Sequence, residues 1–242
     1  MTDAAVVFEE VTCERGGRRV VGPLAFTVAA GETVVLLGAS GSGKTTTLRL
    51  VNRLLPVAEG TVRVQGRPVN AWDPVRLRRG IGYVIQEIGL FPHFTVAENV
   101  ELVPRLEGWT AEARSRRVDE LLHMVGLAPE AFRHRMPHEL SGGQRQRVGV
   151  ARALAADPPI LLCDEPFGAV DPVTRADLQQ QFHELTRRLR RTVLFVTHDV
   201  REALRLGDRI VLLEHGVVRF AGTPGEFRSS EDATVRAFRA LL

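Results

Sequence analysis

The sequence has few of the residues that form disulfide frameworks, metal clusters or membrane spans. Its 242 residues include two cysteines, Cys13 and Cys163. Two widely separated cysteines form neither a disulfide framework nor a metal-ligand cluster, so we expect a reducing compartment. Apolar runs such as 159–163 fall far short of the roughly 18 to 20 residues that span a bilayer. The first ten residues carry acids where a signal peptide has its apolar core, so we expect no signal peptide.

Lysine is almost absent, because Lys44 is the only lysine among 32 basic residues. The net charge is +3, yet acidic and basic residues alternate along most of the chain. The arginine-rich segment 187–191 follows a stretch that contains Asp177 and Glu184, a pattern typical of a solvated helix face. We therefore expect no nucleic-acid partner. The hydrophobic share of 44% and the charged share of 25% indicate an ordinary globular chain.

The N-terminal third reads as strands followed by a glycine-rich loop and a helix. Segments 6–11 and 20–28 alternate in polarity around a turn at Gly16 and Gly17, which predicts an antiparallel pair. Thr33–Leu37 is a continuous aliphatic run typical of a strand buried on both faces. A helix is expected over about 44–54, so this part forms the start of a βα unit.

The rest of the chain separates into a helical stretch and further strands. Helix start signals occur at Thr95 with Glu98, at Thr110 and at Ser141. Strands are expected at 61–64, 81–85, 160–163, 192–196, 210–213 and 217–221, the last two as a hairpin. Helices are expected after Asp73–Pro74 and Asp171–Pro172, and a helical tail after Thr223. We divide the chain into an α/β core (1–86 and 158–222) with an antiparallel β subdomain, an inserted helical subdomain (87–157) and a short C-terminal helical tail (223–242).

A phosphate-binding loop follows the first buried strand. The segment Gly38-Ala39-Ser40-Gly41-Ser42-Gly43-Lys44-Thr45 matches the pattern G-x4-G-K-[ST]. Its glycines let backbone N–H groups turn toward phosphates, and the helix N-terminus adds partial positive charge. Lys44 is expected to reach the β and γ phosphates and Thr45 to offer a hydroxyl to Mg²⁺. We expect Lys44 to lie at the rim of an open site and to react with amine reagents.

Two later strands end in residues suited to phosphate chemistry. The strand 160–163 is followed by Asp164 and Glu165. Asp164 is placed to hold Mg²⁺, and Glu165 to polarise an attacking water. The strand 192–196 leads to His198, whose imidazole is expected to bond the γ-phosphate. Alone, such residues more often cap helices, and the phosphate loop favours the catalytic interpretation.

The segment Leu140-Ser141-Gly142-Gly143-Gln144 predicts a second phosphate-binding helix N-terminus. Ser141 precedes two glycines at the expected start of a helix. One nucleotide cannot easily use both helix N-termini within one chain, so the pattern favours two subunits that share the nucleotide.

Over essentially its whole length the sequence resembles the nucleotide-binding subunits of ATP-binding-cassette (ABC) transporters. The motifs occur in that family's order: the phosphate loop, Tyr83-Val-Ile-Gln86, LSGGQ at 140–144, ILLCDE at 160–165, Phe167–Asp171 and His198. The resemblance implies a P-loop NTPase fold with a mostly parallel sheet flanked by helices. It also implies a head-to-tail dimer of two copies that enclose two ATP molecules.

The family's residue roles transfer to matching positions. The resemblance implies Glu165 as general base, with Lys44, Gln86 and His198 as further catalytic residues. It implies that ATP contacts Gly38, Ala39, Ser40, Gly41, Ser42, Gly43, Lys44, Thr45, Thr46, Arg15, Val20, Ser141, Gly143, Gln144 and Asp171, and that Mg²⁺ contacts Thr45, Gln86 and Asp164. It further implies membrane-embedded permease subunits bound through the Gln86 loop and the helical subdomain, an extracytoplasmic substrate-binding protein, and a peripheral location on the cytoplasmic face of the plasma membrane.

Segments 45–54, 81–93 and 106–109 are most similar to importers of quaternary-amine osmoprotectants such as glycine betaine, choline or carnitine. Amino-acid and other small-solute importers have similar sequences, so they remain an alternative. The family usually has an aromatic residue near position 15 that stacks on adenine, where this chain has Arg15. Arg15 either stacks on the base in its place or is a solvent-exposed turn residue, in which case Val20 is the remaining base contact. Many osmoprotectant ATPases continue into paired CBS domains, and we expect none here because only 20 residues follow Gly222.

Other functional classes fit the sequence less well. An ABC ATPase of DNA repair has a long coiled coil between its halves, and a translation-type member has two cassettes. A GTPase switch needs an N-K-x-D motif, which is missing. A catalytically inactive nucleotide-binding scaffold is expected to have lost Glu165 or Lys44, and both are present.

Overall fold

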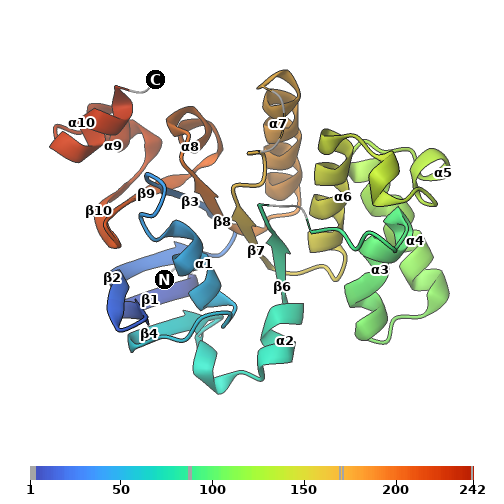
Figure 1. The fold of residues 1–242 in the computed structure, drawn as a ribbon, viewed down its shortest axis with the longest axis horizontal. Helices are drawn as coiled ribbons and strands as arrows, with labels where there is room; N and C mark the ends of the chain where they lie inside the picture. The colour runs from blue at the N-terminus through green and yellow to red at the C-terminus, as the bar shows by residue number, and fades with distance from the viewer. Residues whose placement is uncertain (1–3, 87–88, 169, 171, 241) are drawn as a thin grey trace. The chain divides into compact units, whose positions relative to one another are not determined.

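The computed structural model describes residues 4–86, 89–168, 170, 172–240 and 242. These residues form two compact units, drawn in Figure 1. The first unit comprises Met1–Arg78 and Arg190–Leu242, and the second comprises Arg79–Leu189. The helical subdomain expected at 87–157, inserted into an α/β core, stays a prediction.

An antiparallel sheet makes up the N-terminal part of the first unit. Its strand order is β2-β1-β4-β5, with β1 at Ala4–Arg15, β2 at Arg18–Ala29, β4 at Glu59–Val64 and β5 at Arg67–Pro68. Gly16 and Gly17 form the β1–β2 turn, both with positive φ, which matches the twist of a two-residue hairpin. Phe8 pairs with Phe26 across the strands, and their stacked rings lie 4.4 Å apart between centroids. The predicted antiparallel pair is confirmed.

A second sheet in the same unit is built around β3 (Thr33–Leu37). All five β3 residues are buried, as their aliphatic and β-branched side chains predict. β3 pairs in parallel with β8 (Thr192–Thr197) on one side and β9 (Arg209–Glu214) on the other. β10 (Val217–Gly222) pairs antiparallel with β9, so the hairpin expected around Gly216 is confirmed.

The helices of the first unit follow these strands. They are α1 (Lys44–Val51), the 3-10 turn η1 (Val69–Ala71), α2 (Pro74–Arg79), α8 (Val200–Leu206), α9 (Pro224–Ser229) and α10 (Ala233–Arg239). Sequence analysis did not predict α8, although its signals are present: Asp199 accepts from the N–H groups of Arg201 and Glu202 as N-cap. The tail starts as expected, because Thr223 and Glu226 form a capping box at α9.

The second unit contains two parallel strands and the helices from α3 to α7. β6 (Ile81–Val84) pairs with β7 (Ile160–Asp164). The helices are α3 (Val96–Leu106), α4 (Ala111–Met124), α5 (Pro129–Phe132), the 3-10 turn η2 (Pro137–Glu139), α6 (Gly142–Leu154) and α7 (Pro172–Arg188). Figure 1 shows α3, α4, α5 and α6 gathered into one bundle. The N-caps predicted at Thr95, Thr110 and Ser141 are confirmed, whereas Asp171, the predicted N-cap of α7, lies outside the described residues.

None of the helices in the described part of the chain combines the length and the apolar character that a bilayer crossing requires. This agrees with the short apolar runs of the sequence.

The C-terminal helices are part of the core of the first unit, which gives a stability prediction. Phe227 of α9 is fully buried and meets Phe220 edge to face at 5.4 Å. We expect Phe227→Ala to lower the free energy of unfolding by about 3 to 5 kcal/mol, because it removes the ring and leaves a cavity. Phe91→Ala is the control: Phe91 is 40% exposed, so the loss should stay within about 1 kcal/mol. Urea denaturation followed by circular dichroism measures both, and equal losses would contradict the buried role of Phe227.

Candidate functional site

The phosphate loop connects β3 to α1 within the first unit. A Cβ atom on Gly38 would lie 2.4 Å from the Leu213 carbonyl oxygen, so the close backbone approach requires glycine. Gly43 has φ 101° and is the N-cap of α1, without a side-chain cap. The N-cap of α1 therefore offers no side-chain acceptor of its own to the start of the helix. Ser42 Oγ is buried and has no hydrogen-bond partner within the described chain, so it is available to a ligand oxygen.

Lys44 is not exposed at the rim of this loop, and that expectation was wrong. Its side chain is 5% exposed. Nζ donates to the carbonyl oxygens of Gly38 and Ala39, both at 2.8 Å. The ammonium group folds back onto its own loop because these carbonyls compensate its burial. Thr45 and Thr46, the next two residues, are half-buried at the start of α1.

A chain of backbone hydrogen bonds ties the loop to the rest of the first unit. The Gly216 N–H donates to the Ser42 carbonyl at 3.1 Å, and the Gly22 N–H donates to the Gly216 carbonyl at 2.7 Å. We call this chain the Gly216 strap. Sequence analysis identified Gly216 only as a hairpin turn, and no local signal shows that it joins the phosphate loop to β2. Val20, an expected nucleotide contact, lies half-buried in β2 beside this strap.

His198 lies at the same sheet edge as the start of the phosphate loop. In the parallel β3–β8 pair, Leu37 is opposite Thr197. Gly38 directly follows Leu37, and His198 directly follows Thr197. The two residues therefore leave neighbouring strands, whose axes in a sheet are about 4.8 Å apart. His198 is exposed there. The structure therefore brings together the phosphate loop and His198.

In the second unit, β6 and β7 likewise end side by side. Val84 pairs in parallel with Cys163. Gln86 lies two residues after Val84, and Glu165 lies two residues after Cys163. Asp164 is 3% exposed, and the Tyr83 hydroxyl lies 3.4 Å from its Oδ2. The arrangement brings Gln86, Asp164 and Glu165 to one edge, where carboxylate and amide oxygens gather.

Glu165 has an unusual backbone conformation. Its φ of 44° lies in the left-handed region, which costs a non-glycine residue about 1 to 3 kcal/mol. Strain of this kind is concentrated at functional sites, where the surroundings fix a side chain in a required direction. Glu165 is half-buried, and its backbone conformation sets the direction in which the side chain leaves the chain.

The LSGGQ segment forms the N-terminus of α6. The Gln144 N–H donates to Ser141 Oγ at 3.2 Å, and the Ser141 N–H donates to Gln144 Oε1 at 2.9 Å. A Cβ on Gly143 would lie 3.0 Å from Thr174 Cγ2, so a larger residue would disturb the contact with α7. Ser141 itself is exposed. The described part of the site thus presents an exposed helix N-terminus with its hydroxyl already oriented.

Two polar residues missed by sequence analysis shape the segment after β6. Asn99 is fully buried, accepts from the Phe91 N–H at 2.8 Å and donates to three carbonyls of 91–95. Arg152, in the last turn of α6, donates to the Gly89 carbonyl at 2.7 Å, and burial lowers the pKa of its guanidinium. Arg152 fixes the loop from 63 residues away in the sequence and Asn99 from four to eight residues away, and sequence analysis recognised neither contact.

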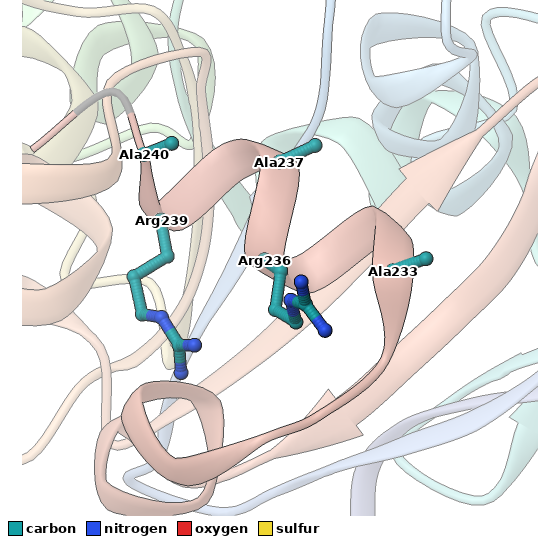
Figure 2. A pocket seen from close by; sticks show the side chains of 5 residues that line it. All are labelled: Ala233, Arg236, Ala237, Arg239 and Ala240. Atoms are coloured by element: carbon teal, nitrogen blue, oxygen red, sulfur yellow. The ribbon is translucent and has the colours of Figure 1, made fainter.

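A surface hollow of about 600 Å³ lies elsewhere, on α10 (Figure 2). It is lined by Ala233, Arg236, Ala237, Arg239 and Ala240. None of these belongs to the phosphate loop or to the other candidate residues. This hollow is therefore not the site.

The burial of Lys44 gives a labelling prediction. We expect an amine-acylating reagent to modify the N-terminal amine of the folded, ligand-free chain faster than Lys44, by on the order of tenfold or more, because Lys44 reacts only when the loop opens locally. Mass spectrometry after short exposures measures both sites. In urea the two amines should react at comparable rates. Equal rates in the folded protein would contradict the observed burial.

Comparisons with known proteins agree with this geometry. The family model described as "ABC transporter" matches residues 21–168. The glycine betaine/carnitine/choline transport ATP-binding protein OpuCA of Bacillus subtilis is 51% identical over 88% of this chain and 56% of its own length. The osmoprotectant import ATP-binding protein OsmV of Salmonella typhimurium is 53% identical over 82% of this chain and 52% of its own. The chain thus spans little more than half the length of these relatives.

A solved structure extends the likeness to the whole fold. The ATP-binding cassette MJ0796, in a dimeric post-hydrolysis state bound to ADP and Pi, is 36% identical with a TM-score of 0.81, over 90% of this chain and 98% of that one. The fold is accordingly that of the P-loop NTPase cassettes. Since the family model covers more than half of the chain and the relatives share about half of its residues, this chain belongs to the ABC transporter family.

Proposed function

We propose that this chain binds and hydrolyses Mg-ATP and thereby powers an ABC importer. The observation that carries the proposal is the phosphate loop. Its α1 N-terminus has no capping side chain, its Ser42 hydroxyl has no partner among the described residues, and its Lys44 is buried, features that suit a polyphosphate. Lys44 exchanges the carbonyls of Gly38 and Ala39 for β and γ phosphate oxygens, a stronger charge-assisted bond. Backbone N–H groups of residues 38–46 bind the remaining phosphate oxygens.

The residues present fit a magnesium ion. Thr45, Gln86 and Asp164 offer hydroxyl, amide and carboxylate oxygens, which are the donors that Mg²⁺ takes beside phosphate and water. When bound, Mg²⁺ neutralises phosphate charge and holds the phosphoryl group in orientation.

The chemical step is assigned to Glu165 and His198. Glu165 takes the proton of the attacking water, and its strained backbone holds the carboxylate in place for that transfer. His198 donates a hydrogen bond to the γ-phosphate at the edge where the phosphate loop begins. Lys44 and the N-terminus of α1 stabilise the charge that develops on the phosphate oxygens.

A second copy of the chain completes each site. The exposed Ser141 and Gly143 at the start of α6 are assigned to the γ-phosphate held by the partner copy, together with Gln144 and Asp171. The similar cassette MJ0796 is dimeric in its post-hydrolysis state, which supports this arrangement. The dimer lies at the cytoplasmic face of the plasma membrane and binds permease subunits through the Gln86 loop and the helical subdomain, and a substrate-binding protein delivers the solute. We assign no nucleic-acid partner.

The solute class is assigned to quaternary amines such as glycine betaine, choline or carnitine. The names of the relatives OpuCA, OsmV and OpuBA of Bacillus subtilis, the last a choline transport protein at 49% identity, support this choice. An importer of another small solute, such as an amino acid, is the alternative.

The role of Glu165 is tested by Glu165→Gln. This change keeps the side-chain shape but removes the proton acceptor, so hydrolysis should fall on the order of a hundredfold, about 3 kcal/mol in barrier, while ATP still binds. Size-exclusion chromatography with ATP should show more dimer than the parent. Glu231→Gln, an exposed charge on a distant segment, should hydrolyse like the parent. Normal hydrolysis by Glu165→Gln would reject Glu165 as general base.

The transport role is tested in cells that lack osmoprotectant uptake. Co-expression of the chain with the permease and binding protein encoded beside it should give uptake of labelled glycine betaine, choline or carnitine. Lys44→Ala should abolish uptake, because phosphate binding is lost. Uptake of amino acids alone would reject the solute class and keep the ATPase role.

A further inference from the structure

Tyr83 is the only tyrosine of the chain, and its hydroxyl meets the carboxylate at the end of β7. The phenol O–H donates to Asp164 Oδ2 at 3.4 Å. Asp164 is 3% exposed, and Tyr83 is half-buried. Sequence analysis placed Tyr83 in a motif without a role of its own. The proposed function assigns Asp164 to Mg²⁺ and likewise leaves the hydroxyl unused.

The register of β6 and β7 brings the two side chains to one face. The strands are parallel neighbours, and Tyr83 is paired with Leu162 (Figure 1). Paired residues lie on the same face of a sheet, and so do residues two apart along one strand. Asp164 follows Leu162 by two residues and is therefore the diagonal neighbour of Tyr83. Strands about 4.8 Å apart and a rise of about 6.6 Å give a diagonal of roughly 8 Å, which the long tyrosine side chain spans.

Close packing on the opposite face holds β6 in place. A Cβ on Gly82 would lie 2.4 Å from the Ala153 carbonyl oxygen of α6 and 2.5 Å from Leu161 Cδ2 of β7. Gly82 and Tyr83 are consecutive in the strand, so they face opposite sides of it. The close contact at Gly82 thus fixes the backbone from which Tyr83 reaches Asp164.

The two strands offer Asp164 few other polar side chains. The remaining residues of β7 are all buried, and they are Ile160, Leu161, Leu162 and Cys163. The remaining residues of β6 have no polar side chain, and they are Ile81, Gly82 and Val84. A buried carboxylate needs hydrogen bonds or an opposite charge to compensate its lost hydration. Among the side chains of these two strands, Tyr83 supplies the hydroxyl that can do so.

A hydrogen bond to one oxygen also determines how the carboxylate is turned. The last side-chain torsion of an aspartate is broad, so the backbone alone does not select an orientation. A donor at Oδ2 favours one orientation of the Asp164 carboxylate before a cation arrives. Carboxylates that ligate metals are themselves held by outer hydrogen bonds, and the loss of one costs about 10- to 100-fold in metal affinity or activity.

We propose that Tyr83 is a positioning residue for magnesium, whose hydroxyl orients the Asp164 carboxylate for the ion that accompanies the nucleotide. This inference rests on the proposed function and deepens it, because Tyr83 acts through Asp164 and contacts neither the ion nor the nucleotide. Removal of the hydroxyl should therefore leave metal-free nucleotide binding unchanged. The increase in affinity that Mg²⁺ brings should become smaller.

The experiment is isothermal titration calorimetry of the full chain with ADP, once in excess Mg²⁺ and once in EDTA. We call the ratio of the two affinities the magnesium gain. Tyr83→Phe keeps the ring and should lower the magnesium gain about tenfold, at the low end of the range for outer hydrogen bonds because 3.4 Å is long for an O–H···O bond. Its affinity for ADP in EDTA should stay within about twofold of the parent.

Two further variants separate positioning from a general loss of stability. Thr186 is buried in α7, and its hydroxyl donates to the Phe182 carbonyl at 3.0 Å. Thr186→Val therefore also removes a buried hydroxyl bond, but not one to Asp164, and should keep the parent's magnesium gain. In an Asp164→Ala background, Tyr83→Phe should change the magnesium gain by less than about twofold, because no carboxylate remains to be oriented.

A spectroscopic measurement follows the hydroxyl itself. Because Tyr83 is the only tyrosine, a chain labelled with carbon isotope at tyrosine Cζ gives one NMR signal. That carbon bears the hydroxyl, so its chemical shift responds to the hydrogen bond. Asp164→Ala should move the signal of the nucleotide-free chain, whereas Thr186→Val should not. A signal that Asp164→Ala leaves in place would overturn the contact on which the inference rests.

The possible failures are distinguishable. A parent chain that binds no ADP overturns the proposed function and this inference together. A parent that binds ADP without a magnesium gain overturns the magnesium assignment and the inference, while nucleotide binding stands. If Tyr83→Phe keeps the parent's gain, or weakens ADP binding equally with and without Mg²⁺, the positioning role is rejected and the proposed function is kept. A loss that persists in the Asp164→Ala background also rejects it, because Tyr83 then does not act through Asp164.

Discussion

The parallel pairing of β3 with a strand on each side is the constraint on which the first unit depends. Every β3 residue is buried, so all of its backbone polar groups need partners within the sheet. β8 and β9 supply them, and the Asp208 carboxylate accepts from the Thr33 N–H at 2.9 Å where β3 begins. Because both parallel neighbours share one direction, the carboxyl ends of β3 and β8 coincide. The phosphate loop and His198 owe their proximity to that coincidence.

Close packing around two glycines then sets the shape of the loop. The close approach of Gly38 to Leu213 and of Gly43 to Val21 excludes side chains at both positions. The Gly216 strap adds two hydrogen bonds that connect the loop to each sheet of the first unit. A loop fixed in this way needs little reorganisation on binding, which preserves binding energy that a flexible loop would lose to ordering.

The sequence was most informative where local chemistry decides structure. The buried β3, the phosphate loop and the N-caps at Thr95, Thr110 and Ser141 follow from residue types at fixed spacing, and the structure has them. The helix α8 was missed because a seven-residue helix shows only two turns of periodicity. Tertiary contacts account for the other omissions. No local pattern shows that the carbonyls of its own loop bury Lys44. Nor does a local pattern show the bulge in β2, where Val20 is an extra residue, because it depends on the register between β1 and β2.

The two helix N-termini assigned to phosphate differ in how they are prepared for it. At α1 the N-cap is Gly43, which has no side chain, so no capping side chain stands between the helix N-terminus and an anion. At α6 the Ser141 hydroxyl already accepts from the Gln144 N–H, and Gln144 returns a bond to Ser141.

The capping box at α6 leaves the hydroxyl proton of Ser141 free for donation, since the hydroxyl oxygen accepts one bond while its O–H can point outward. The first N–H groups of α6, from Gly142 and Gly143, are likewise not used by the box. An anion at α6 therefore meets a side-chain donor that is already oriented, whereas at α1 the Gly43 N-cap offers no side chain and the phosphates are assigned to the loop backbone and Lys44. The α6 terminus thus depends on a capping box for its shape, and the α1 terminus depends on the Gly216 strap and on close packing around glycines.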